Sequence, residues 1–173
     1  MANERTATFS PANVKIIISQ GNWSHVMSGY AEDTFVRVVP QSDKFEMYIG
    51  ADRTATRVYK GNEAGTIEVT LQQTSSSNDI LSQVYKNDVA NPSADTMFSI
   101  MVKDNSGRSL YYADEAYIGK TPDSDFANSM QTRQWSIMVP RLIEHIGGNS
   151  KFSPEDAAAY EALGGSIDPR WVP

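Results

Sequence analysis

The segment at residues 66–84, TIEVTLQQTSSSNDILSQV, changes from strand periodicity to helix periodicity within a few residues. Polar and apolar residues alternate in its first part, which predicts a strand with one solvated face and one buried face formed by Ile67, Val69 and Leu71. The polar run at 74–77 ends the strand, and Ser76 or Ser77 is expected to cap a helix whose first turn contains Asp79. A one-sided strand and a short amphipathic helix need a covering layer, so the chain is expected to fold around this pair.

Runs of β-branched and aromatic residues elsewhere predict further short strands separated by turn residues. They lie at residues 14–19, 23–28, 34–39, 44–49, 54–60, 97–103, 109–118 and 133–139. Residues 87–96, NDVANPSADT, are expected to form a loop. Many short strands with a few helices predict a mainly β (α+β) fold, a β-sandwich or barrel with one helix packed on it.

Residues 36–60 are expected to form a long β-hairpin or an extended arm around a turn at residues 50–53. The first strand of the hairpin places Phe45, Met47 and Ile49 on one side, whereas the faces of its partner do not separate into apolar and polar. A two-stranded ribbon of this composition is marginal alone. It therefore needs support from its own domain or from a neighbouring subunit.

The composition limits the class of protein. The formal net charge is −6, whereas a protein that binds nucleic acid by neutralising phosphates needs clustered Lys and Arg. The chain has no cysteine, which excludes a disulfide scaffold and thiolate chemistry. The longest apolar run is too short to cross a bilayer, and the N-terminus lacks the pattern of a signal peptide. We expect synthesis in a reducing cytoplasm and no membrane partner.

No motif with a catalytic meaning is present. The two histidines, His25 and His145, do not have the spacing of metal ligands, and a lone histidine is usually structural. Asp123-Ser124-Asp125 begins like a calcium loop but lacks its glycine and distal glutamate, which favours a solvated turn. There is no nucleophile elbow and no phosphate-binding loop, so neither an enzyme nor a metal or cofactor site is expected.

A change of character near residue 148 divides the chain into a predicted β domain at residues 1–148 and a C-terminal extension at residues 149–173. Ser153, Pro154 and the two acidic residues after them form a helix-start signal. The last residues, SIDPRWVP, are too rich in proline to be helical, and they include Trp171.

Several segments, in this order and spacing, carry a family resemblance. They are SPANVKIIISQ at residues 10–20, SGYAEDTFVRV at 28–38, FEMYIGADRTATRVYKGNEAGTIEVTL at 45–71, QTSSSND at 73–79 and YIGKTPDSDFANSMQTRQWSIMVPRLIEHIGG at 117–148. Over roughly residues 8–148, the chain resembles the tail tube proteins of contractile-tailed bacteriophages.

The resemblance implies hexameric rings whose inner sheets join edge to edge into a barrel, and rings that stack into a tube for DNA delivery. Ring closure suits a chain of many short strands, because it covers strand edges. The implied partners are other copies of the chain, the tail sheath protein, and baseplate and tail terminator proteins. DNA would pass through without specific binding, and an acidic or neutral bore would let this polyanion slide. The implied location is the virion, after assembly in the host cytoplasm.

The resemblance also suggests roles for particular residues. The arm at residues 40–62 would contact the next ring, with Phe45, Tyr48 and Tyr59 as candidate anchors; the alternative is a hairpin folded on its own domain. The helix after Ser77 would lie on the outer side, facing the sheath. The polar face of the central strand is a candidate bore lining, although an ordinary outward face has the same pattern: Thr66, Glu68, Thr70 and Gln72.

The sequence is compatible with more than one role for the C-terminal extension, more than one kind of tube and a second class of protein. The C-terminal extension departs from the family pattern, so we expect either an arm that docks on a neighbouring subunit or the sheath through Trp171, or a disordered end. The tube could belong to a type VI secretion system or a tail-like particle. The alternative class is a monomeric or dimeric β-sandwich binding module. Such a module could be a baseplate accessory domain or a carbohydrate-binding domain whose tyrosines and Trp23 stack on sugars.

Overall fold

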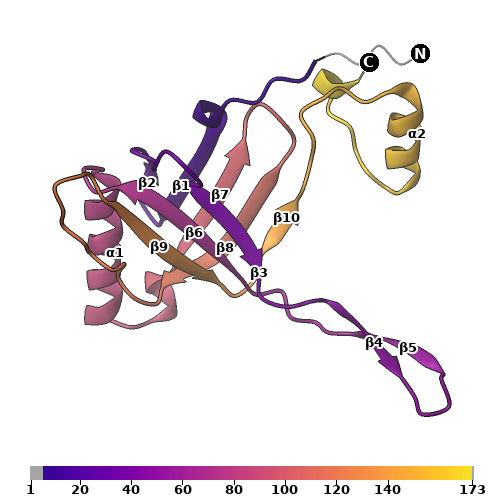
Figure 1. Cartoon of the computed structure of the whole chain (residues 1–173), viewed down its shortest axis with the longest axis horizontal. Coiled ribbons are helices and arrows are strands. Elements are labelled where there is room, and N and C mark those ends of the chain that lie inside the picture. The colour runs from indigo at the N-terminus through magenta and orange to yellow at the C-terminus, as the bar shows by residue number, and fades with distance from the viewer. Residues whose placement is uncertain (1–5, 173) are drawn as a thin grey trace.

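The computed structural model describes residues 6–172, so residues 1–5 and 173, at the ends of the two predicted domains, lie outside the described residues. Within this described part, ten strands and two α-helices follow one another along the chain (Figure 1). The strands are β1 (Val14–Gln20), β2 (Trp23–Val26), β3 (Val36–Pro40), β4 (Phe45–Ile49), β5 (Ala55–Tyr59), β6 (Gly65–Gln72), β7 (Phe98–Asp104), β8 (Leu110–Ile118), β9 (Thr132–Val139) and β10 (Ile143–His145). The helices are α1 (Ser77–Ala90) and α2 (Pro154–Ala162).

Eight strands form one antiparallel sheet in the order β2-β1-β7-β8-β9-β6-β3, with β10 beside β8. Strand β8 joins two layers, because residues 110–116 pair with β7, and 110–112 also with β10, whereas Tyr117 and Ile118 pair with β9. The inward side chains of both layers meet in one core, and Ile67, Val69 and Leu71 of β6 are fully buried in it. The predicted mainly β fold with a packed helix is confirmed.

A bulge in β8 changes which way its side chains point. Phe98 pairs with Ala116 and Ile100 with Ala113, so β8 carries one extra residue at this point. Ala113 and Ala116 are both buried, and the two acidic residues between them, Asp114 and Glu115, are both exposed. The bulge therefore keeps adjacent carboxylates in solvent.

Three serines fix the start of α1 against the loop after β2. The side chain of Ser76, at the N-cap position, makes no capping bond. Instead the Ser75 hydroxyl accepts from the Ser77 N–H at 3.2 Å and donates to the Ser28 carbonyl at 2.6 Å. The buried Ser77 hydroxyl accepts from the Ser28 N–H at 3.1 Å and lies 2.8 Å from Nε2 of His25. The predicted cap at Ser76 or Ser77 is wrong, because tertiary contacts decide which serine faces inward.

Other boundaries also differ from the predictions. Residues 87–96 are not a loop throughout, since α1 continues to Ala90 and a 3-10 turn covers Ala94–Thr96. Strand β10 was not predicted, and the proline-rich C-terminal end contains a single 3-10 turn at Pro169–Trp171. The predicted hairpin is longer than expected, because β3 continues into β4 and β5 returns into β6, with β3 paired to β6.

We expect Ser77→Ala to lower the free energy of unfolding by about 1–3 kcal/mol, because it leaves the Ser28 N–H and His25 without their buried partner. The matched control is Ser76→Ala, which removes an exposed hydroxyl with no capping bond and should change stability by less than about 0.5 kcal/mol. Urea denaturation of the unassembled protein measures both. A larger loss for Ser76→Ala would contradict this account of the helix start.

Candidate functional site

The hairpin at residues 41–64 leaves the body as a free arm (Figure 1). All residues of β4 and β5 are exposed. The base of the arm is tied down, because the Leu142 N–H donates to the Glu63 carbonyl at 2.8 Å and Arg141 forms an ion pair with Glu63 at 3.2 Å. The hairpin is therefore an arm and is not folded on its own domain.

The turn at the tip of the arm is well defined. The Arg53 N–H donates to the Gly50 carbonyl at 2.9 Å, and Arg53 has a φ of 69°. The Asp52 carboxylate accepts from both the hydroxyl and the N–H of Thr54, at 2.6 and 3.1 Å. These hydrogen bonds, that of the hydroxyl first, hold the pKa of Asp52 below its ordinary value, so the carboxylate stays ionised. The tip can present its side chains without rearranging.

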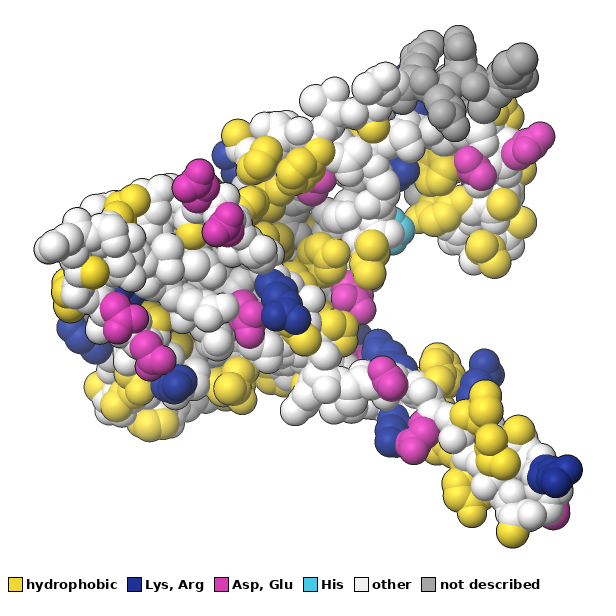
Figure 2. All heavy atoms as spheres, viewed as in Figure 1, with side chains coloured by type: hydrophobic (Ala, Val, Ile, Leu, Met, Phe, Trp, Pro, Cys, Tyr) yellow, Lys and Arg dark blue, Asp and Glu magenta, His cyan; other side chains and the backbone are white. Residues whose placement is uncertain are grey.

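The register of the arm sorts the predicted anchors onto two faces. Phe45 lies opposite Tyr59, with ring centroids 5.5 Å apart, and the Arg57 guanidinium lies 4.8 Å from the Phe45 ring. Tyr48 lies on the other face, opposite Thr56. Alternation puts two further apolar side chains on the Phe45 face, and both are largely exposed: Met47 at 72% and Ile49 at 61%. Figure 2 shows hydrophobic side chains along the projecting arm.

The predicted bore residues share one face of the central strand. Thr66, Glu68, Thr70 and Gln72 are half-buried, opposite the fully buried core side chains. Arg37 of β3 lies 3.9 Å from Glu68, and this pair is partly exposed. The face extends over β9 through the side chains paired with β6, which are mostly polar and uncharged: Thr132, Gln134, Ser136 and Met138. On this surface the charge of Glu68 is compensated by that of Arg37, and the side chains of β6 and β9 add no positive charge.

The C-terminal extension folds back onto its own chain. The Arg108 guanidinium lies 4.3 Å from the Phe152 ring and 4.8 Å from the Trp171 ring. It also donates to the Ser150 carbonyl at 2.5 Å, and the Phe152 N–H donates to the Trp171 carbonyl at 3.0 Å. The predicted anchor Trp171 therefore packs on Arg108 of the same chain, and contact with a neighbour stays a prediction.

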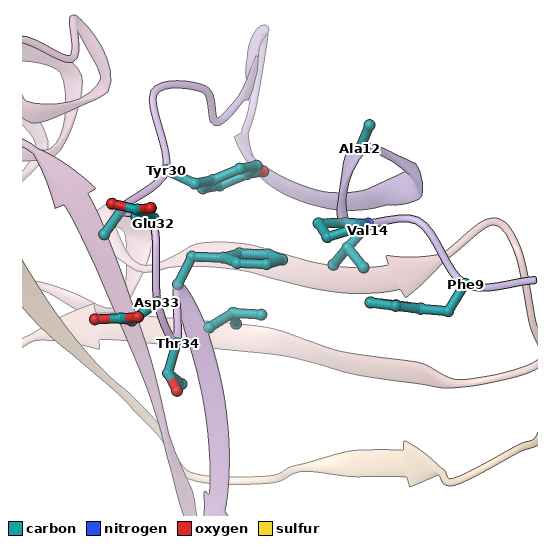
Figure 3. A pocket seen from close by; sticks show the side chains of 11 residues that line it. Phe9, Ala12, Val14, Tyr30, Glu32, Asp33 and Thr34 are labelled. Carbon is teal, nitrogen blue, oxygen red and sulfur yellow. The ribbon is translucent and has the colours of Figure 1, made fainter.

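A hollow lies between the start of β1 and the loop before β3 (Figure 3). Phe9, Val14 and the rings of Tyr30 and Phe35 line it, and these two rings are tilted by 31° with their centroids 4.8 Å apart. The carboxylates of Glu32 and Asp33 point away from it (Figure 3). The Tyr30 hydroxyl is buried without a hydrogen-bond partner, and burial raises the pKa of Tyr30. This apolar hollow lacks the assembled nucleophile, base and orienting group of an active site.

Within residues 6–172 there is no group of three or more His, Cys, Asp or Glu that could hold a metal ion. Neither helix in this part of the chain is long and apolar enough to cross a membrane. Three surfaces remain as candidates for function: the arm, the polar face of β6, and the packing of Phe152 and Trp171 on Arg108, which we call the C-terminal clasp.

Comparisons with known proteins agree on one family. A model of the bacteriophage PhiTE tail tube protein family matches residues 6–147. Structural protein ORF10 of Pseudomonas phage KPP10 is 44% identical over 170 residues, covering 97% of this chain and 98% of that protein. The aligned length therefore includes most of the C-terminal extension, which the family model does not.

Two solved structures share the fold. One is a chain of the PVC sheath-tube complex, an extracellular contractile injection system in its extended state, with a TM-score of 0.51 and 12% identity. The match covers 76% of this chain and 88% of that chain. The other is the tube-terminating cap of the anti-feeding prophage, with a TM-score of 0.50 and 12% identity, covering 84% of this chain and 99% of that one.

We expect Arg108→Ala to loosen the C-terminal clasp. Loss of two half-buried cation–π contacts, each about 0.5–1 kcal/mol, together with the hydrogen bond to the Ser150 carbonyl, should speed hydrogen exchange of the Phe152 N–H at least roughly ten-fold. Arg53→Ala removes an arginine from the distant arm and should leave this rate unchanged. Mass-spectrometric hydrogen exchange of the unassembled protein measures both, and an unchanged rate in Arg108→Ala would refute the clasp.

Proposed function

The chain belongs to the bacteriophage PhiTE tail tube protein family, and we propose that it closes into hexameric rings that stack as the inner tube of a phage tail. As a tail tube protein it is a structural component of the virion. The observation that carries the proposal is the arm, whose apolar face has no cover within the described chain. A monomer that leaves such a surface in water exposes an aggregation site, whereas a tube buries it between rings.

Sheet edges support ring closure. Strand β3 pairs with β6 on one side only, and residues 132–136 of β9 pair with β6 on one side only. The layer formed by β3, β6 and β9 thus ends in two unpaired edges, which neighbours in a ring would cover. The number six comes from the family resemblance.

The polar face of β6 lines the bore in this proposal. A DNA conduit must not hold its cargo, and binding strength depends on phosphate contacts by Lys and Arg. The basic side chain that β3 places on this face, Arg37, already lies 3.9 Å from Glu68. The surface therefore offers DNA hydroxyl and amide groups with no excess positive charge.

The outer partners follow from the same arrangement. Helix α1 covers one end of the sandwich, and Ile80 and Val89 on it are exposed. We assign this outer side to the tail sheath, and the two ends of the tube to baseplate and terminator proteins. The similar fold found in a sheath-tube complex and in a tube-terminating cap supports this assignment.

Electron microscopy of the purified protein tests assembly. We expect Phe45→Ser with Met47→Ser to raise the critical concentration for tube formation roughly thirty-fold, because truncating an interface anchor costs about 2 kcal/mol. Both side chains are exposed in the monomer, so its unfolding midpoint should not change.

Two controls sharpen this test. Val89→Ser changes an equally exposed position on α1 and should leave tube formation intact. Tyr48→Ser probes the opposite face of the arm and should have the smaller effect. Tubes that form normally in the Phe45/Met47 variant but not in Tyr48→Ser would show that the wrong face was chosen.

The bore assignment predicts a gain of DNA binding. Tubes of Glu68→Lys with Thr70→Lys should retain short duplex DNA, protected from nuclease and released by salt, because the bore becomes basic. The matched control, Gln83→Lys with Val89→Lys and Ala90→Lys, makes the same change of +3 in charge at exposed positions of α1, so DNA bound there should be digested. Equal digestion in both variants would refute the bore assignment.

A further inference from the structure

The arm has a counterpart at the other end of the molecule. The loop at residues 119–131, between β8 and β9, lies at the opposite end of the long axis from the arm (Figure 1). It contains no helix or strand, and it exposes two large apolar side chains, Phe126 at 85% and Met130 at 58%. Two large exposed apolar side chains on one short loop make it a candidate interaction site.

Buried contacts hold this loop in one conformation. The Arg133 side chain, only 8% exposed, donates to the Asp125 carbonyl at 3.1 Å and lies 5.2 Å from the Phe126 ring. The loop is also joined to the chain after β6, because the Gln73 N–H donates to the Gln131 carbonyl at 3.1 Å. The apolar side chains are therefore presented by a fixed backbone.

Unpaired charges of opposite sign lie on the loop and on the arm. The arm has equal numbers of acidic and basic side chains, but Glu46 pairs with Lys60 and Asp52 bonds Thr54, so within residues 6–172 Arg53 and Arg57 form no ion pair. The loop carries Asp123 and Asp125 against a single lysine, Lys120, and none of these three forms an ion pair within the described residues. Opposite charges around apolar centres favour docking in one register.

We propose that the arm of one copy docks on the 119–131 loop of a second copy in the next ring. The Phe45 face of the arm packs on Phe126 and Met130, and Arg53 and Arg57 lie near Asp123 and Asp125. This inference rests on the proposed function and adds the partner surface to it. An open stack needs two different, complementary surfaces at opposite ends of the subunit, because a head-to-tail contact repeats without closing.

The occupant is a second copy because the arm cannot reach its own loop. Its base is fixed by Glu63 and Leu142, and it points away from the loop (Figure 1). Each contact is small, but ring-on-ring stacking repeats it for every subunit. When several such contacts form between the same two rings, their combined affinity far exceeds that of one contact, so each arm can bind weakly and the rings still stack stably.

The absence of cysteine from the chain makes a site-specific test possible. Met130→Cys, labelled with a benzophenone photo-crosslinker, is mixed as a minor component with unlabelled protein, assembled into tubes and irradiated. Peptide mass spectrometry then identifies the crosslinked partner. We expect most intermolecular crosslinks to fall within residues 41–64. The matched control is the same label at Val89→Cys, which is similarly exposed on α1 and should capture at least about ten-fold less of the arm, since the reach of the probe limits it to adjacent surfaces.

The outcomes separate this inference from the proposed function. Crosslinks from Met130→Cys to any region other than the arm, in tubes that assemble normally, would overturn the docking and leave the tube intact. Failure of the unmodified protein to form rings or tubes, even with the terminator or baseplate proteins present, would overturn the proposed function itself. Excess unlabelled protein ensures that the label does not prevent assembly.

Discussion

The pairing of β6 with β3 on one side and β9 on the other fixes the position of every surface described above. Burial of Ile67, Val69 and Leu71 sets the register, since a slip of one residue would move these side chains to the solvated face. The same register places Glu68 and Thr70 on the polar face, and the chain continues from the β3–β6 pair into β4 and β5 outside the body. One apolar stripe therefore orients both the candidate bore and the arm.

Sequence periodicity predicted the strands that bury one face, because alternation is a local property of the chain. Periodicity did not predict the features whose conformation depends on contacts with residues far away in the sequence. The serine that faces inward at the start of α1 is selected by Ser28 and His25, which lie far away in sequence. Strand β10 contains only Ile143–His145, all exposed, and it exists because β8 offers an edge. Helix α1 continues through polar residues that have the composition of a loop.

The candidate site shows the same division. Aromatic residues in a hairpin identified Phe45 and Tyr59, which the register brings together, and Tyr48, which it places on the other face. Met47 and Ile49 could have been included from alternation alone. Whether the hairpin would fold back could not be predicted, since it depends on how Arg141 and Leu142 hold its base. The partner of Trp171 could not be predicted either, because Arg108 lies in a different part of the chain.

The strength of the contacts suits a protein that must exist as a soluble subunit before it polymerises. The clasp on Arg108 consists of a hydrogen bond to the Ser150 carbonyl and two cation–π contacts worth about 0.5–1 kcal/mol each, so it holds the extension only weakly. The arm buries nothing in the monomer, so displacing it costs little folding energy. Neither element stabilises a single subunit much, and both present apolar side chains on preformed backbone. These two elements therefore stabilise the assembled tube more than the single subunit, because many weak contacts between subunits act together.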